Sequence, residues 1–80
     1  MKLSDSDREQ AVLLLRCAAD LVTRGNTYSF SIALTVVGAT KVACSAARDA
    51  YAEAYWPACA AGFFDYHTTL LEAAQLLDDD

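Results

Sequence analysis

The first third of the chain places its apolar residues on one helical face. They recur every three or four positions, as in an amphipathic helix. The stripe consists of Ala11, Leu14, Leu15, Ala18, Leu21 and Val22. Ser6 with Glu9 fits a capping box at the start of this helix. Ser4 with Asp7 is a competing start about half a turn earlier. Because a Gly-Asn pair beyond the stripe is a strong stop signal, the pattern predicts a helix over residues 5–24.

Residues 29–37 are hydrophobic nearly all round. The apolar positions are Phe30, Ile32, Ala33, Leu34, Val36 and Val37. Their β-branched content would also suit a buried strand. The chain offers no second strand to pair with it, and a lone strand leaves its backbone groups unsatisfied. We therefore expect a short central helix over these residues.

A third helix is predicted over residues 41–55. Gly38 indicates a stop, and Thr40 is a good N-cap for a new helix that begins at Lys41. The face expected to be buried is made of small residues, which let a neighbouring helix approach closely. They are Ala43, Ala46, Ala47, Ala50 and Ala54. Pro57 disfavours helical geometry at Trp56, so the helix should end there. The sequence leaves open whether this helix is separate from the second or whether both form one rod bent at Gly38.

The last helix is predicted over residues 66–77, with Asp65 as its N-cap. Its apolar stripe is Tyr66, Leu70, Ala73, Ala74 and Leu77. Residues 78–80 are three consecutive aspartates, which oppose the helix dipole at this end. We expect them to form a frayed acidic tail. The four elements together predict one all-α domain over residues 1–80, a compact bundle of four short helices.

The amino-acid composition predicts an excess of apolar surface. Of the 80 residues, 55% are hydrophobic, 21% are charged and sixteen are alanine. This composition excludes intrinsic disorder. It also indicates more apolar surface than one small core can bury. The net charge is −5, and the whole surplus lies in residues 56–80. Because no segment has a surplus of Lys and Arg, the charge disfavours nucleic acid as a partner.

Targeting and redox signals are weak. The first residues are polar and acidic where a signal peptide would become apolar. The uncharged stretch over residues 27–40 is too short to span a bilayer. Cys17, Cys44 and Cys59 are odd in number and form no CxxC motif, so a disulfide framework is not expected. We expect a cytoplasmic protein with no membrane contact.

The sequence contains few of the residue patterns that catalysis requires. His67 is the single histidine, and nothing in the sequence pairs it with a cysteine nucleophile, although a dyad formed in space stays open. The acids lie mostly near helix ends, where capping and solvation explain them. One histidine and three scattered cysteines match no zinc spacing, and there is no glycine-rich phosphate loop. We therefore expect no enzyme activity, no metal and no cofactor.

Residues 32–48 resemble a helix-turn-helix, with two short helices joined at a glycine. The positions that fit its internal packing are Ala33, Val37, Ala39, Cys44 and Ala47. The second helix would offer Lys41, Ser45 and Arg48 to DNA. Asp49 and Glu53 lie close behind and make the local charge neutral. This neutral charge disfavours DNA reading, so an ordinary helical corner is the simpler interpretation. A DNA-binding transcriptional regulator, acting as a dimer, is the alternative function.

Aromatic residues are concentrated in residues 51–66, which hold six of the eight. They flank residues 57–62, which are apolar where a surface loop is usually polar. Rings around an apolar loop are typical of an interface anchor; alternatively, they close the end of an alanine-rich bundle. Tyr55 and Trp56 are adjacent, so at least one should be peripheral. The predicted partner-binding residues are Tyr51, Tyr55, Trp56, Phe63, Phe64, Asp65 and Tyr66.

The function that these features favour is a small, acidic, non-catalytic protein-binding module. Its partner would be another protein or a second copy, since a homodimer through the aromatic end would bury excess apolar surface. In size and character the chain is similar to accessory proteins of phages and mobile elements. Some of those, the anti-CRISPR proteins among them, are stoichiometric inhibitors of host defence. A small structural subunit of an assembly is a further alternative.

Overall fold

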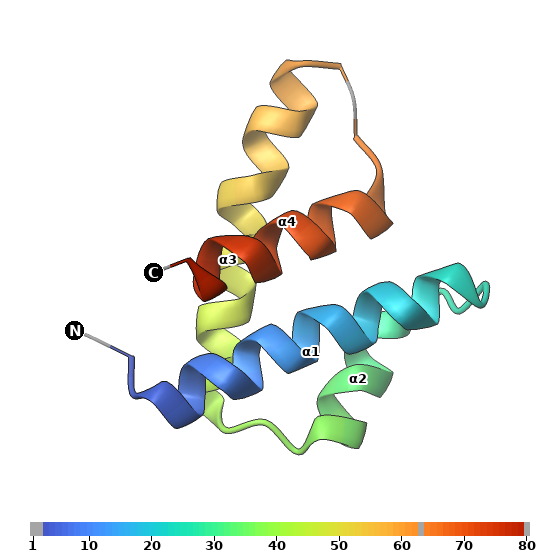
Figure 1. The fold of residues 1–80 in the computed structure, drawn as a ribbon. Helices are drawn as coiled ribbons and strands as arrows, with labels where there is room; N and C mark the ends of the chain where they lie inside the picture. The colour runs from blue at the N-terminus through green and yellow to red at the C-terminus, as the bar shows by residue number, and fades with distance from the viewer. Residues whose placement is uncertain (1–2, 63, 80) are drawn as a thin grey trace.

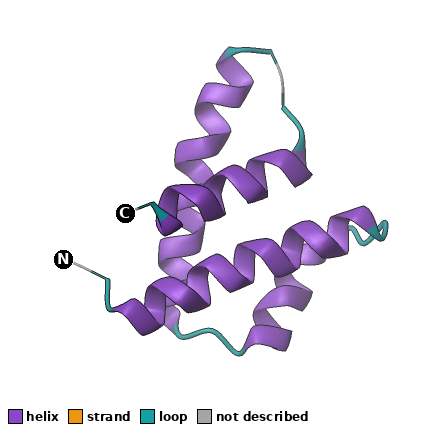
Figure 2. Ribbon diagram, viewed as in Figure 1, coloured by secondary structure: helices purple, strands orange, loops and turns teal. Residues whose placement is uncertain are grey.

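The structure is a computed structural model that describes residues 3–62 and 64–79. It contains α1 (Asp5–Thr23), α2 (Ser29–Val37), α3 (Lys41–Ala60) and α4 (Tyr66–Asp78) (Figure 1). Within these ranges there is no strand (Figure 2). The predicted all-α class and the four-helix bundle are confirmed.

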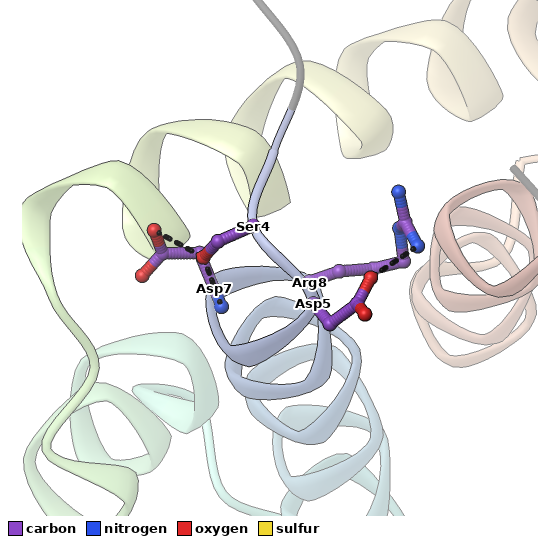
Figure 3. A network of polar contacts seen from close by, with 4 residues as sticks. All are labelled: Ser4, Asp5, Asp7 and Arg8. Atoms are coloured by element: carbon purple, nitrogen blue, oxygen red, sulfur yellow. Dashed lines mark hydrogen bonds and ion pairs between the residues drawn. The ribbon is translucent and has the colours of Figure 1, made fainter.

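The first helix begins at the earlier of the two predicted starts. Ser4 is the N-cap, and its Oγ accepts the backbone N–H of Asp7 at 3.1 Å. The same Oγ donates to the Asp7 carboxylate at 3.0 Å (Figure 3). Arg8 Nη1 pairs with Asp5 Oδ1 at 3.4 Å on the adjacent side of this turn (Figure 3). Two hydrogen bonds on one hydroxyl explain why the Ser4 start prevails over the Ser6 box.

The end of α1 agrees with the predicted stop signal, one residue earlier than expected. Gly25 adopts φ +79°, and its N–H donates to the Val22 carbonyl at 3.0 Å. The Asn26 N–H donates to the Leu21 carbonyl at 3.1 Å. This pair of bonds is a Schellman motif, which satisfies carbonyls that the helix leaves free. The last helical residue is therefore Thr23.

The second and third helices are separate. Gly38 ends α2 in the left-handed region at φ +65°, with its N–H donating to the Leu34 carbonyl. Two residues later the Thr40 hydroxyl caps α3 by accepting the Ala43 N–H at 3.1 Å. The open question of one bent rod is thereby answered, because the backbone leaves helical geometry completely between the two elements.

The predicted end of the third helix was wrong. α3 continues through Trp56 and Pro57 to Ala60, five residues beyond the expected end at Tyr55. Proline removes only the bond to the Glu53 carbonyl, and Glu53 lies on the exposed side of α3, where water can replace that bond. Hydrogen bonding then resumes, since the Ala61 N–H donates to the Pro57 carbonyl at 3.0 Å. The effect of proline on the preceding residue is a preference, and the helix overrides it.

The fourth helix has the predicted cap and one residue more than predicted. The Asp65 carboxylate accepts the Thr68 N–H at 2.9 Å. At the other end Asp78 is still helical, and its Oδ2 pairs with Arg16 Nη2 of α1 at 3.2 Å. Of the three terminal aspartates, Asp78 thus belongs to α4, while Asp80 lies outside the described residues.

The core is built around α1, which packs against each of the other three helices, while α3 also packs against α4. Ten of its fifteen buried hydrophobic residues are alanines. The largest fully buried apolar side chains are Leu14, Leu15 and Leu70. The predicted alanine face of α3 is buried at four of its five positions, and Ala46 is half-buried. Such small side chains leave stability sensitive to changes in the separation of the helices.

The expectation that residues 29–37 are central was wrong. α2 packs mainly against α1 at the edge of the bundle (Figure 1). Only Ser29 and Ala33 of this helix are buried, and Val36 is 70% exposed. A nine-residue helix on one neighbour buries one face, so its apolar residues on the other side meet solvent. None of the helices in the described ranges is both long and apolar enough to cross a membrane.

Candidate interaction surface

The aromatic residues of the predicted site form a connected series of rings. Tyr66 meets Tyr51 edge-on at 5.8 Å between ring centroids, and Tyr51 stacks on Tyr55 at 5.9 Å. Tyr55 then meets both Trp56 and Phe64 edge-on at 5.1 Å. These separations and angles are those of favourable ring pairs. The series joins the last turns of α3, which project past α4, to the segment that leads into α4 (Figure 1).

The inner part of the series belongs to the core. Tyr51 and Tyr66 are half-buried and pack against the core residues. The Ser29 hydroxyl lies 3.4 Å from the Tyr66 hydroxyl and donates to it, linking α2 to α4. Burial, and after it the nearby Tyr66, Tyr55 and Cys59, raises the pKa of Tyr51 to about 12. These two rings close the end of the alanine-rich bundle, which was the alternative interpretation of the aromatic cluster.

The outer part of the series faces solvent. We call Tyr55, Trp56 and Phe64 the outer aromatic group. Trp56 is 68% exposed and Phe64 is 45% exposed, while Tyr55 is half-buried between them. The prediction that Tyr55 or Trp56 is peripheral is confirmed for Trp56. Phe63, also predicted to contact a partner, lies outside the described residues.

Tyr55 contacts three other rings, and the Cys59 thiol influences its phenol. Its centroid contacts are with Tyr51, Trp56 and Phe64. Cys59, one turn further along α3, raises the pKa of the Tyr55 phenol through hydrogen bonding and charge repulsion. Tyr55 is therefore the residue through which the exposed rings are anchored to the fold.

Asp65 has a structural role in this arrangement. Its Oδ2 accepts both the Thr68 N–H at 2.9 Å and the Thr68 hydroxyl at 2.7 Å. These two bonds hold the pKa of the Asp65 carboxyl below its ordinary value. Its carbonyl accepts the Thr69 hydroxyl at 2.8 Å. The carboxylate predicted to meet a partner is thus engaged in capping α4.

Arg48, which the helix-turn-helix interpretation assigns to DNA contact, contacts a ring of α2 within the fold. The Arg48 guanidinium lies over the Phe30 ring, 5.8 Å from its centroid, in a cation–π contact. The two residues border a hollow of about 240 Å³ with Tyr51, Tyr66 and Leu70. Arg48 therefore links α3 to α2 in this structure. Both cations expected to reach DNA, Lys41 and Arg48, are exposed.

The sequence pattern did not lead us to expect an exposed apolar stripe on α2. Tyr28, Ile32 and Val36 are spaced by four residues and are all exposed. The signal was present in the sequence, because residues 29–37 are hydrophobic nearly all round and offer few polar side chains to solvent. A short helix of that kind, packed on one neighbour, must expose apolar side chains.

A second unexpected feature is a hollow of about 690 Å³ between the start of α1, the middle of α3 and the end of α4. Its walls come from three segments far apart in the chain. No local pattern could therefore have identified it, since its existence depends on how the helices pack.

The cysteines and the side chains that could bind a metal are dispersed over the described residues. Cys17 and Cys44 are half-buried, Cys59 is exposed, and all three are free thiols. Across residues 3–62 and 64–79, no three His, Cys, Asp or Glu side chains gather closely enough to hold a metal ion.

Comparison of the chain with protein-family models, curated proteins and solved structures finds no match.

Proposed function

We propose that this protein is a small, non-catalytic protein-binding module and that the outer aromatic group is its contact surface. The single observation that carries the proposal is the exposure of Trp56, 68% open to solvent beside two further rings. Tryptophan and tyrosine are enriched among the residues that dominate binding energy at interfaces. An exposed aromatic group of this kind marks a surface that gains free energy when a partner covers it.

The ring contacts also support binding with a small loss of conformational entropy. Tyr55 contacts three other rings, and Asp65, the neighbour of Phe64 in the chain, is held as the N-cap of α4. Side chains that are already ordered lose less conformational entropy when a partner arrives. The same surface serves a second copy of the chain or a larger assembly, so these partners belong to the same proposal.

The narrower form of the proposal is a stoichiometric inhibitor of a host defence complex, of the kind that phages and mobile elements encode. Small size, a net charge of −5 and a surface of aromatic anchors support it. A cytoplasmic location belongs to the same proposal and is supported by three free thiols, which suit a reducing compartment.

The proposal is tested by capture from the native source with three baits: the wild-type chain, Trp56→Ala and Val36→Ala. Val36 is exposed to a similar degree, 70%, but lies on α2. We expect a stoichiometric protein that the wild-type and Val36→Ala baits retain and that Trp56→Ala loses. Equal retention by all three baits would exclude the outer aromatic group. Recovery of DNA that a Lys41→Ala bait loses would favour the regulator instead.

A further inference from the structure

The 690 Å³ hollow combines an apolar floor with an acidic rim. We call it the acidic hollow. It is lined by Leu3, Ser4, Asp7, Val42, Ser45, Ala46, Asp49, Ala50, Glu53, Leu76 and Leu77. Its walls come from the start of α1, from α3 and from the end of α4. It shares no lining residue with the outer aromatic group.

The floor of the acidic hollow leaves large apolar side chains open to solvent. Val42 of α3 is 46% exposed and Leu76 of α4 is 47% exposed. Ala46 and Ala50 also line the hollow, with small apolar side chains. Apolar side chains of a partner could cover these groups and remove their surface from water.

The charged residues that line the acidic hollow are all acidic. They are Asp7, Asp49 and Glu53. An adjoining hollow of about 350 Å³ shares Glu53 and Leu76 and adds Glu72 and Asp79. Among the described residues that line either hollow there is no lysine or arginine. Five carboxylates therefore surround one apolar floor, without a cation from the described walls to balance them.

Most of these carboxylates are available to a partner. Asp7 is engaged by Thr40 and Ser4, and Asp79 accepts the Gln75 amide at 2.7 Å. Asp49, Glu53 and Glu72 make no hydrogen bond or ion pair with other side chains in the described ranges and are exposed. Asp49 and Glu53 are four residues apart, so they stand on the same face of α3.

We infer that the acidic hollow and the adjoining 350 Å³ hollow together dock an amphipathic helix of a protein partner, with apolar residues on one face and Lys or Arg on its flanks. The apolar face would cover Val42 and Leu76 while the cations meet Asp49, Glu53 and Glu72, which matches both features of the surface. Lined positions on α3 run from Val42 to Pro57, about 22 Å of helix. A partner helix of about four turns matches that length.

Other occupants fit less well. The carboxylates repel nucleic-acid phosphates and anionic lipid headgroups. A second copy carries the same net charge of −5, with only six basic residues against eleven acidic ones. Charge complementarity thus selects a basic helix on a different protein.

The test uses a fluorescently labelled synthetic peptide of about 18 residues, with leucine on one helical face and lysine on the other. Binding is measured by fluorescence anisotropy with the intact chain. The variant Asp49→Asn/Glu53→Gln removes two rim charges, and Glu9→Gln/Asp20→Asn removes two exposed acids of α1 outside either hollow. We expect the first variant to bind roughly tenfold more weakly, and the matched control to change by less than about twofold.

Two further measurements distinguish burial of the apolar floor from nonspecific electrostatic attraction of the peptide. Leu76→Ser should weaken binding several-fold without loss of helical circular dichroism, because Leu76 is half-exposed. A peptide of the same composition with the leucines scattered around the helix should bind more weakly than the amphipathic one.

Three results would overturn the inference: no binding of the amphipathic peptide, equal weakening by both pairs of substitutions, or equal binding of the scattered peptide. Self-association of the wild-type chain that Leu76→Ser abolishes would also overturn it, by identifying a second copy as the occupant. The outcome is independent of the proposed function, because Trp56→Ala leaves the acidic hollow intact and should bind the peptide as the wild type does.

Discussion

The Thr40 hydroxyl joins two helix starts: it donates to Asp7 Oδ1 at 2.9 Å while it accepts the Ala43 N–H at 3.1 Å. The Thr40 N–H also donates to the Gln10 amide oxygen at 3.0 Å. One residue thus caps α3 and ties it to the first turns of α1. Since Ser4 donates to the other Asp7 oxygen at 3.0 Å, the caps of both helices share one carboxylate.

We expect Thr40→Ala to lower the free energy of unfolding by about 1–2 kcal/mol, because it removes the cap and the bond to Asp7 together. Thr40→Ser should retain most of the stability, since its hydroxyl can make both bonds. The control is Thr35→Ala on the exposed side of α2, where the lost bond is to the Ser31 carbonyl within the same helix. Urea unfolding monitored by circular dichroism measures all three. A loss in Thr40→Ser as large as that in Thr40→Ala would contradict the shared-cap explanation.

The alanine core makes a second prediction. Ala47 is fully buried on α3, where a larger side chain would force neighbouring helices apart. We expect Ala47→Leu to destabilise the fold by roughly 1–3 kcal/mol. Ala52→Leu, at an exposed position of the same helix, should change stability by less than about 0.5 kcal/mol. Chemical denaturation of the two variants is the measurement, and equal stability would show that the core has room to expand.

Elements whose signals are local could be predicted from the sequence. The caps at Thr40 and Asp65 and the stop at Gly25 each depend on one side chain or one backbone angle, and each formed as expected. The continuation of α3 through Pro57 could not be predicted in this way, because proline raises the cost of the helix without forbidding it. Water can replace the bond lost at the exposed Glu53 carbonyl, so the helix continues to Ala60.

The candidate site was only partly predictable for a related reason. Composition located the aromatic cluster, and adjacency of Tyr55 and Trp56 indicated that one ring would be peripheral. Which rings face the core depends on the position of α4 relative to α3, and this position is a result of packing. The edge position of α2 and the acidic hollow depend on packing in the same way, so a linear pattern contained no signal for the hollow.

The outer aromatic group should contribute little to stability. Trp56 is mostly exposed, so we expect Trp56→Ala to change the free energy of unfolding by less than about 1 kcal/mol. Because Trp56 is the single tryptophan, the wild-type fluorescence reports directly on this surface, and iodide should quench it efficiently. Thermal unfolding by circular dichroism compares the variant with Tyr51→Ala, which removes a half-buried ring that touches the core and should cost more. A larger loss in Trp56→Ala would show that Trp56 supports the fold rather than a partner.

Alkaline pH should weaken the fold through Tyr51. Its pKa is raised from 10.0 to about 12, first by burial. A tyrosine in the unfolded chain releases its proton near pH 10, while the folded protein still holds it. The unfolded state then binds fewer protons, so stability is fully present below about pH 10 and is lost between about pH 10 and 12.

Thermal unfolding measured across that window should show the decline in the wild type and a shallower one in Tyr51→Phe, which has no proton to lose. In parallel, the ultraviolet absorbance of tyrosinate should contain a late component near pH 12 that Tyr51→Phe removes. If both chains lose stability in parallel, the Tyr51 phenol is not the group responsible. Because Tyr51 links the core to Tyr55, this titration also tests whether the inner rings stay ordered when the outer ones are free of a partner.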